Sequence, residues 1–217
     1  MKFKELFSNP HLYFPFFFAG CSLYFLLVFY PALYYHLHQP MFLFSGYFFN
    51  EFLLHPGGIT EWLGQFIEQL FYSDLAGALI TGLFFTGIYL ILFRIIRKLA
   101  DVNLAIVLSF LPVSFLLALQ NNYTVPFLLT LKYLFDLLFF LFWLKLPSRF
   151  KTIFFLPLFI LFYCILGGSF YLILMLLIGL YELFYAENYS MAGTTVAAAV
   201  ILPYIAARFF FRRANWA

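Results

Sequence analysis

Four acidic side chains fall within one stretch of the chain, residues 36–74, that contains no lysine or arginine: Glu51, Glu61, Glu68 and Asp74. A carboxylate can accept a proton from a reacting hydroxyl, and carboxylates also hold cations. Glu61 and Glu68 are seven residues apart, which is two helical turns, so they share one side of a helix at roughly 10 Å separation. We therefore expect an acidic ledge that faces water and serves as a base or a cation site. The alternative is an ordinary solvated face.

The residues around these carboxylates predict two short helices at a membrane interface. Ser45 is a suitable N-cap for a helix over residues 46–54, and the sequence HPGG at residues 55–58 ends that helix. Apolar residues then recur at helical spacing; this stripe consists of Ile59, Trp62, Leu63, Phe66, Ile67, Leu70 and Phe71. The opposite side is too polar to span a membrane, so the amphipathic helix should lie in the interface. Trp62 and Phe66 are the side chains expected to dock onto a partner if the chain is a subunit of a complex.

The composition indicates the class of protein. Of the 217 residues, 65% are hydrophobic and 10% are charged, whereas a soluble domain has about 25% charged residues. Several apolar runs of roughly 16 to 23 residues are long enough to cross, or nearly cross, a hydrocarbon core of roughly 30 Å. We predict an all-α protein, a polytopic transmembrane helical bundle that forms a single transmembrane domain over residues 1–217.

Six or seven spans are expected, at residues 13–35, 75–96, 103–120, 124–146, 152–167, 169–185 and 192–209. Lysine and arginine favour the cytoplasmic side of a membrane. They cluster before the first span, after the second and after the fourth: Lys2, Lys4, Arg94, Arg97, Lys98, Lys145, Arg149 and Lys151. All three clusters place the N-terminus in the cytoplasm, which makes residues 36–74 an extracytoplasmic loop with interfacial helices.

The charge rule conflicts with seven spans after residue 150. If residues 152–185 cross twice, the acidic segment 182–188 lies inside and Arg208, Arg212 and Arg213 lie outside. Either this segment crosses once, or the terminal arginines face outward against the charge bias. Outward arginines would suit a lipid phosphate, because a guanidinium binds phosphate with paired hydrogen bonds.

Lys132 and Asp136 are one turn apart within the fourth expected span, where side chains at i and i+4 meet. Each isolated charge at the centre of a bilayer costs at least about 2.5–3.5 kcal/mol. We therefore expect an intramembrane polar pair, which is either a static ion pair or part of a polar path, a proton relay or a substrate contact.

Other kinds of site are not indicated. His36, His38 and His55 lack the cysteine or carboxylate that would complete a recognised metal-binding spacing, so no metal site is predicted. No phosphate-binding loop, dinucleotide-binding pattern or Ser–His–Asp pattern occurs, so no cofactor is predicted. Nothing basic and soluble indicates a nucleic-acid partner.

Four segments carry a resemblance to a known family: FFNEFLLHPGG at 48–58, ITEWLGQFIEQLFY at 59–72, GALITGLFFTGIYLILFRIIRKL at 77–99 and LPYIAARFFF at 202–211. Their order resembles a family of multi-pass inner-membrane proteins of unknown function from the Bacteroidota. The resemblance implies a bacterial inner-membrane location. It also implies further spans and a helical-repeat outer domain, so the chain is expected to be the N-terminal part of a longer protein.

In architecture, the arrangement is also similar to membrane-embedded glycosyltransferases that use polyprenyl-phosphate sugars. That resemblance implies a catalytic Asp or Glu in the first outer loop, and Glu51 ranks first because it follows the first span most closely. The other candidates are Glu61, Glu68 and Asp74, and Arg208, Arg212 and Arg213 would bind the lipid phosphate. The chain departs from those enzymes because it lacks an Asp-x-Asp motif and an acidic residue directly after the first span.

Three functions are therefore carried forward. The first is the membrane half of a lipid-linked sugar transferase, with membrane lipids and polyprenyl phosphate as ligands. The second is a non-catalytic subunit that docks onto other membrane protein subunits through Trp62 and Phe66. The third is a transporter that uses Lys132 and Asp136.

Overall fold

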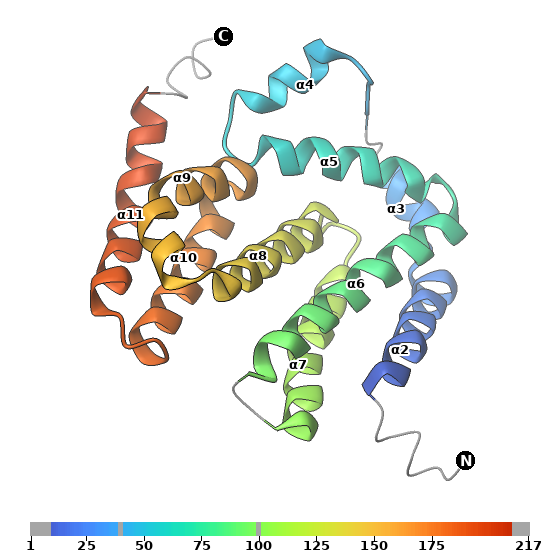
Figure 1. The fold of residues 1–217 in the computed structure, drawn as a ribbon. Helices are drawn as coiled ribbons and strands as arrows, with labels where there is room; N and C mark the ends of the chain where they lie inside the picture. The colour runs from blue at the N-terminus through green and yellow to red at the C-terminus, as the bar shows by residue number, and fades with distance from the viewer. Residues whose placement is uncertain (1–9, 39–40, 99–100, 210–217) are drawn as a thin grey trace. The chain divides into compact units, whose positions relative to one another are not determined.

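The computed structural model describes residues 10–38, 41–98 and 101–209, and these residues are almost entirely helical (Figure 1). Within those ranges the chain forms ten α-helices, one π-helical turn and one 3-10 turn, and no strand. Four of the helices are long and apolar enough to cross a membrane, or five if the bent first helix counts as one span. The all-α prediction is confirmed for this part of the chain.

Not all of the predicted spans are present as spanning helices. The four that qualify are α6 (Asp74–Ile96), α7 (Val102–Gln120), α9 (Ser148–Leu166) and α11 (Tyr189–Phe209). The run predicted at 124–146 forms α8 (Leu128–Lys145), which carries Lys132, Asp136 and Lys145. The run predicted at 169–185 forms α10 (Gly168–Phe184), whose 17 residues extend about 26 Å. That length is below the roughly 30 Å of a hydrocarbon core.

The chain groups into two compact units. The first unit comprises residues 1–42 and 64–134, and the second comprises residues 43–63 and 135–217. Both α5 (Gly58–Gln69) and α8 contribute residues to each unit. The single transmembrane domain predicted for the whole chain stays a prediction.

In the first unit, the first predicted span is a broken helix. α2 (Pro10–Tyr24) continues as a π-helical turn, η1 (Phe25–Phe29), and Tyr30 then adopts the left-handed conformation with φ of 52°. α3 (Pro31–His38) leaves at an angle of 59°. A proline has no N–H to continue the hydrogen-bond ladder of a helix, which explains why the break falls here.

The backbone groups freed by the break have partners within the first unit. The Tyr123 hydroxyl donates to the carbonyl oxygen of Phe29. The N–H of Ala32 donates to Asp74 Oδ1 at 2.8 Å. Such partners are needed because an unsatisfied backbone group in an apolar environment is strongly unfavourable.

α2 and α6 pack against each other in the first unit through a close contact at Gly82. A Cβ atom at this position would lie 2.2 Å from Ser22 Oγ, so only glycine fits. The rings of Phe25 and Phe85 extend the same contact, with centroids 5.3 Å apart. Small residues at such crossings are typical of membrane helices.

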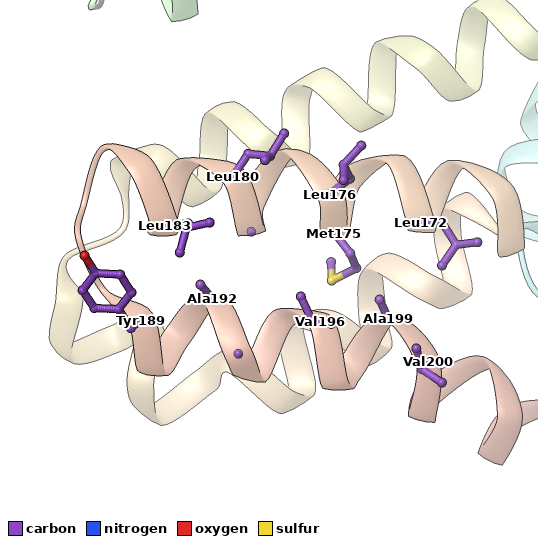
Figure 2. Close-up of a pocket in the computed structure, with 12 residues that line it drawn as sticks. Leu172, Met175, Leu176, Leu180, Leu183, Tyr189, Ala192, Val196, Ala199 and Val200 are labelled. Carbon is purple, nitrogen blue, oxygen red and sulfur yellow. The ribbon is translucent and has the colours of Figure 1, made fainter.

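In the second unit, α9 and α10 meet at Gly167, whose φ of 78° reverses the chain. Figure 2 shows α10 and α11 side by side in opposite directions, with Leu183 near Tyr189 at one end and Leu172 near Val200 at the other. An apolar groove of about 560 Å³ lies between the two helices. Residues 152–185 therefore form two helices, and the side on which the terminal arginines lie stays a prediction.

A buried ion pair joins α9 to α10 at the end of the second unit remote from Gly167. Lys151 Nζ lies 2.7 Å from Glu182 Oε1, and Trp143 Nε1 donates to the same oxygen at 2.9 Å. The Lys151 side chain is 10% exposed and that of Glu182 is 2% exposed. The Lys151 ammonium also lies over the rings of Trp143 and Tyr181. Glu182, one of the two acids of the segment that conflicted with the charge rule, is thus neutralised by a basic residue from the preceding helix.

Breaking this pair should destabilise the protein. Glu182→Gln leaves Lys151 as a buried charge without its counterion, and removal of one partner of a buried pair typically lowers the free energy of unfolding by about 3–5 kcal/mol. Thermal unfolding of the purified protein in detergent measures the loss. The double variant Lys151→Met with Glu182→Leu should recover much of it, because no buried charge remains. A single variant as stable as the wild type would contradict this role.

Candidate functional site

The predicted turn between the two interfacial helices is present in the second unit. α4 (Gly46–Leu53) begins at Ser45, whose hydroxyl accepts the Phe48 N–H at 3.1 Å, as an N-cap does. Gly57 has φ of 85°, a conformation that side chains with a Cβ rarely adopt. α5 begins at Gly58, where a Cβ would overlap the carbonyl of Phe52. The glycines therefore allow the chain to reverse tightly between α4 and α5.

This turn caps the C-terminal end of α9. Gly57 N–H donates to the carbonyl oxygen of Cys164 at 2.9 Å, and the Thr60 hydroxyl donates to that of Ile165 at 2.5 Å. The last carbonyls of a helix have no partner within the helix, so the turn satisfies two of them. A Cβ at Gly57 would lie 3.0 Å from the Cα of Gly167. We call this end of the second unit, formed by residues 54–57 and Gly167, the loop end.

A histidine–carboxylate dyad lies at the loop end. His55 Nε2 and Glu61 Oε2 are 2.7 Å apart, and the side chains are 42% and 28% exposed. The reversal at Gly57 brings the last turn of α4 and the first turn of α5 together, so that residues six apart in sequence meet. A dyad of this kind can exchange protons with a bound molecule because it reaches solvent on one side.

An apolar cavity of about 330 Å³ adjoins the dyad through Leu54, the residue before His55. Ligand pockets commonly have volumes of roughly 300–1,000 Å³. The lining comes from three elements of the second unit: Leu53 and Leu54, then Ile160, Tyr163 and Cys164 of α9, and Leu202, Ile205 and Ala206 of α11. The loop end thus combines a histidine–carboxylate pair with an apolar cavity.

Arg208 lies on α11 two residues after Ala206, so it belongs to the same end of the second unit as the cavity. Its side chain is exposed, and Nη1 donates to the Tyr204 hydroxyl at 3.0 Å. The other two candidate phosphate ligands, Arg212 and Arg213, lie outside the described residues. The first-ranked carboxylate, Glu51, is exposed on α4, one helical turn before His55.

The structure corrects the prediction that Glu68 faces water. Glu68 is 8% exposed in the first unit, and its Oε1 accepts the Tyr34 hydroxyl at 3.0 Å, while Tyr34 Oη itself accepts the Phe127 N–H at 2.7 Å. Burial raises the pKa of the Glu68 carboxyl, whereas the Tyr34 hydroxyl, the His38 ring and the backbone at Phe127 and Leu128 lower it. The prediction of a water-facing acidic ledge is therefore wrong at Glu68.

The two sides of the amphipathic segment are not separated as expected. Thr60 and Glu68 of the polar side are buried. Of the apolar stripe, Ile67 and Phe71 are buried, whereas Ile59 and Leu70 are exposed.

Asp74 has a structural position in the first unit. It occupies the first turn of α6 and accepts the Ala32 N–H, so it caps the N-terminus of α3. A carboxylate at the N-terminus of a helix is favourable because it opposes the positive end of the helix dipole.

The proposed docking residues pack within the chain itself. Phe66 contacts Phe42 in the first unit with ring centroids 5.2 Å apart, and Trp62 contacts Phe49 in the second unit at 5.1 Å. Asp136 of α8 is fully buried, and neither of its carboxylate oxygens has a hydrogen-bond partner among the described residues. The intramembrane pair with Lys132 stays a prediction.

His55 is the functional candidate that the sequence analysis missed. It was considered only as a metal ligand, and its partner is a carboxylate on the next helix. The signal that could have found it is the His-Pro-Gly-Gly turn itself, since a tight reversal places a residue just before it beside the first turn of the following helix.

Several apolar helices that could cross a membrane indicate a helical membrane protein. The chain belongs to a family of unknown function, DUF6057, whose profile matches residues 7–216. The match confirms that the chain resembles a family of unknown function, whereas the Bacteroidota origin and the glycosyltransferase-like architecture stay predictions. No curated protein and no solved structure matches the chain.

Alanine at Gly57 or at Gly167 should detach the turn from α9. Both glycines have positive φ and lie against each other's backbone, and the left-handed conformation costs an ordinary residue roughly 1–2 kcal/mol. We expect each substitution to lower the midpoint of thermal unfolding. Gly168→Ala is the matched control, because a Cβ there meets nothing within 4 Å. Equal effects at all three positions would contradict the close contact.

Glu68 should give the protein a stability that depends on pH. Because burial raises the pKa of this carboxyl, the folded protein binds the proton more tightly than the unfolded chain does. The resulting stabilisation is fully present below the ordinary glutamate pKa and is lost as pH rises through the raised value. Glu68→Gln keeps an oxygen for Tyr34 and removes the ionisation, so its unfolding midpoint should not fall over that pH range.

Unfolding midpoints of the wild type, Glu68→Gln and the exposed-site control Glu51→Gln, each measured over a pH series, check this expectation. A wild-type curve with the same pH dependence as the Glu68→Gln curve would show that Glu68 does not carry the effect.

Proposed function

We propose that this chain is the membrane half of a lipid-linked sugar transferase of the bacterial inner membrane, acting on a polyprenyl-phosphate sugar at the extracytoplasmic face. The observation that supports it best is the loop end of the second unit, where the His55–Glu61 dyad adjoins an apolar cavity on the helix that carries Arg208. A lipid with an apolar tail and an anionic head needs an apolar cavity for the tail and a nearby cation for the head, and the cavity and Arg208 would supply them.

The reaction requires two kinds of protein group, a base and a cation. An acceptor hydroxyl oxygen forms a bond to the anomeric carbon of the sugar, and the bond from that carbon to the phosphate oxygen breaks with its electron pair. The dyad takes the hydroxyl proton, so that the attacking oxygen does not develop a positive charge. The polyprenyl phosphate leaves with an added negative charge, which a guanidinium at Arg208 would stabilise through charge-assisted hydrogen bonds.

The cavity suits the part of the lipid nearest the phosphate. Its lining is formed almost wholly by leucine, isoleucine and alanine side chains, with Tyr163 and Cys164 on one wall. Cys164 is an exposed free thiol and Cys21 is a buried one. Thiol labelling at Cys164 therefore reports directly on whether the cavity is occupied.

The binding test uses protein in lipid nanodiscs with Cys21 replaced by serine and a maleimide probe. We expect polyprenyl phosphate to slow the labelling of Cys164 several-fold, and polyprenol, which has the same tail and no phosphate, to slow it less. Arg208→Gln should remove the difference between the two lipids, because the phosphate loses its cation.

The matched control is Arg149→Gln, which changes the net charge equally at an exposed position in the first turn of α9, remote from the cavity. This control should preserve the preference for the phosphate. Labelling rates that neither lipid changes would contradict the proposal and favour the docking subunit instead.

A further inference from the structure

The two members of the dyad have different surroundings. Glu61 lies in the first turn of α5, where the positive end of the helix dipole favours the carboxylate form. His55 is the more exposed member, with 42% of its side chain accessible against 28% for Glu61. It directly follows Leu54 of the cavity lining. The imidazole is therefore the more accessible of the two groups.

The contact between the two side chains leaves one nitrogen of the imidazole available. Nε2 of His55 lies 2.7 Å from Glu61 Oε2. A carboxylate only accepts hydrogen bonds, so Nε2 carries a hydrogen that it donates to Glu61. In the neutral imidazole, Nδ1 is then the nitrogen with a free lone pair, and it can accept a proton.

We propose that His55 is the catalytic base of this site, acting through Nδ1, and that Glu61 is a positioning residue that holds the imidazole in the required tautomer. This inference rests on the proposed transferase function for the reaction, although the tautomer itself does not depend on it. The base would differ from the acidic loop residue that the sequence resemblance implied.

The dyad accounts for the proton that the acceptor hydroxyl loses. As the acceptor oxygen bonds to the anomeric carbon, its proton moves to Nδ1 and the imidazole becomes an imidazolium, which the Glu61 carboxylate stabilises. The titratable or charged groups on the elements that form the loop end are Glu51 on α4, Glu61 on α5, Tyr163 and Cys164 on α9, and Arg208 on α11. Among the described residues, Glu61 is the one whose hydrogen-bond contact with the His55 ring is seen.

The first test is the tautomer, which needs no substrate. Nitrogen NMR of protein with isotope-labelled histidine distinguishes the two neutral forms, and the His55→Gln variant identifies the His55 signals. We expect the Nε2–H form in the wild type and a mixture of forms in Glu61→Gln, with the signals of His36 and His38 unchanged. A wild-type signal from the Nδ1–H form would overturn the assignment of the base.

The second test is the pH dependence of sugar transfer from a polyprenyl-phosphate sugar to a soluble acceptor. His55→Gln should lower the rate of sugar transfer by about 10²–10⁴-fold. The remaining rate of this variant should lack the acidic limb, which is the fall in rate toward low pH that protonation of the base causes. Glu61→Gln should also be slower but should keep that limb, because the imidazole that accepts the proton is still present. If Glu61→Gln loses the limb and His55→Gln keeps it, the carboxylate is the base and the inference is wrong.

The two tests separate the inference from the proposed function. No transfer by the wild type, together with the Nε2–H tautomer, would overturn the transferase and leave the geometry of the dyad intact. Transfer by the wild type, together with the Nδ1–H tautomer, would overturn the role of His55 alone.

Discussion

The capping of α9 is the interaction on which the candidate site depends. A helix that ends against apolar surroundings leaves its last carbonyl oxygens without partners, and each unsatisfied group is strongly unfavourable. The N–H of Gly57 and the hydroxyl of Thr60 supply two of those partners. The same contact fixes where the α4–α5 turn lies, and therefore where His55 and Glu61 meet and where Leu54 borders the cavity.

The opposite end of the second unit shows how a charge can be tolerated in an apolar protein. Glu182 is buried with a lysine ammonium and an indole N–H on one of its oxygens, so its charge has both a counterion and hydrogen bonds. The pair also explains why counting loop charges gave an ambiguous result after residue 150. Lys151 was counted as a free loop cation, but it is neutralised by an acid from the following helix. Charge counting assumes that each residue acts independently, and here two of them do not.

Local signals in the sequence predicted the helices around the site well. The Ser45 cap, the turn at residues 55–58 and the amphipathic α5 follow from side-chain chemistry within a few residues. The burial of Thr60 and Glu68 did not follow, because periodicity defines two sides of a helix and not which residues meet the rest of the protein. Glu68 was accordingly placed in water although it is buried beside Tyr34. Contacts between residues far apart in sequence, such as that of the α4–α5 turn with α9, leave no periodic signal at all.

The break after η1 limits how far the first helix reaches along the direction of α2. The eight residues of α3 extend about 12 Å along their own axis. Because of the 59° bend, they add only about 6 Å along the direction of α2. Tyr34, which lies on the bent segment, is 1% exposed in the first unit, where it donates to Glu68 and stacks on the ring of His38.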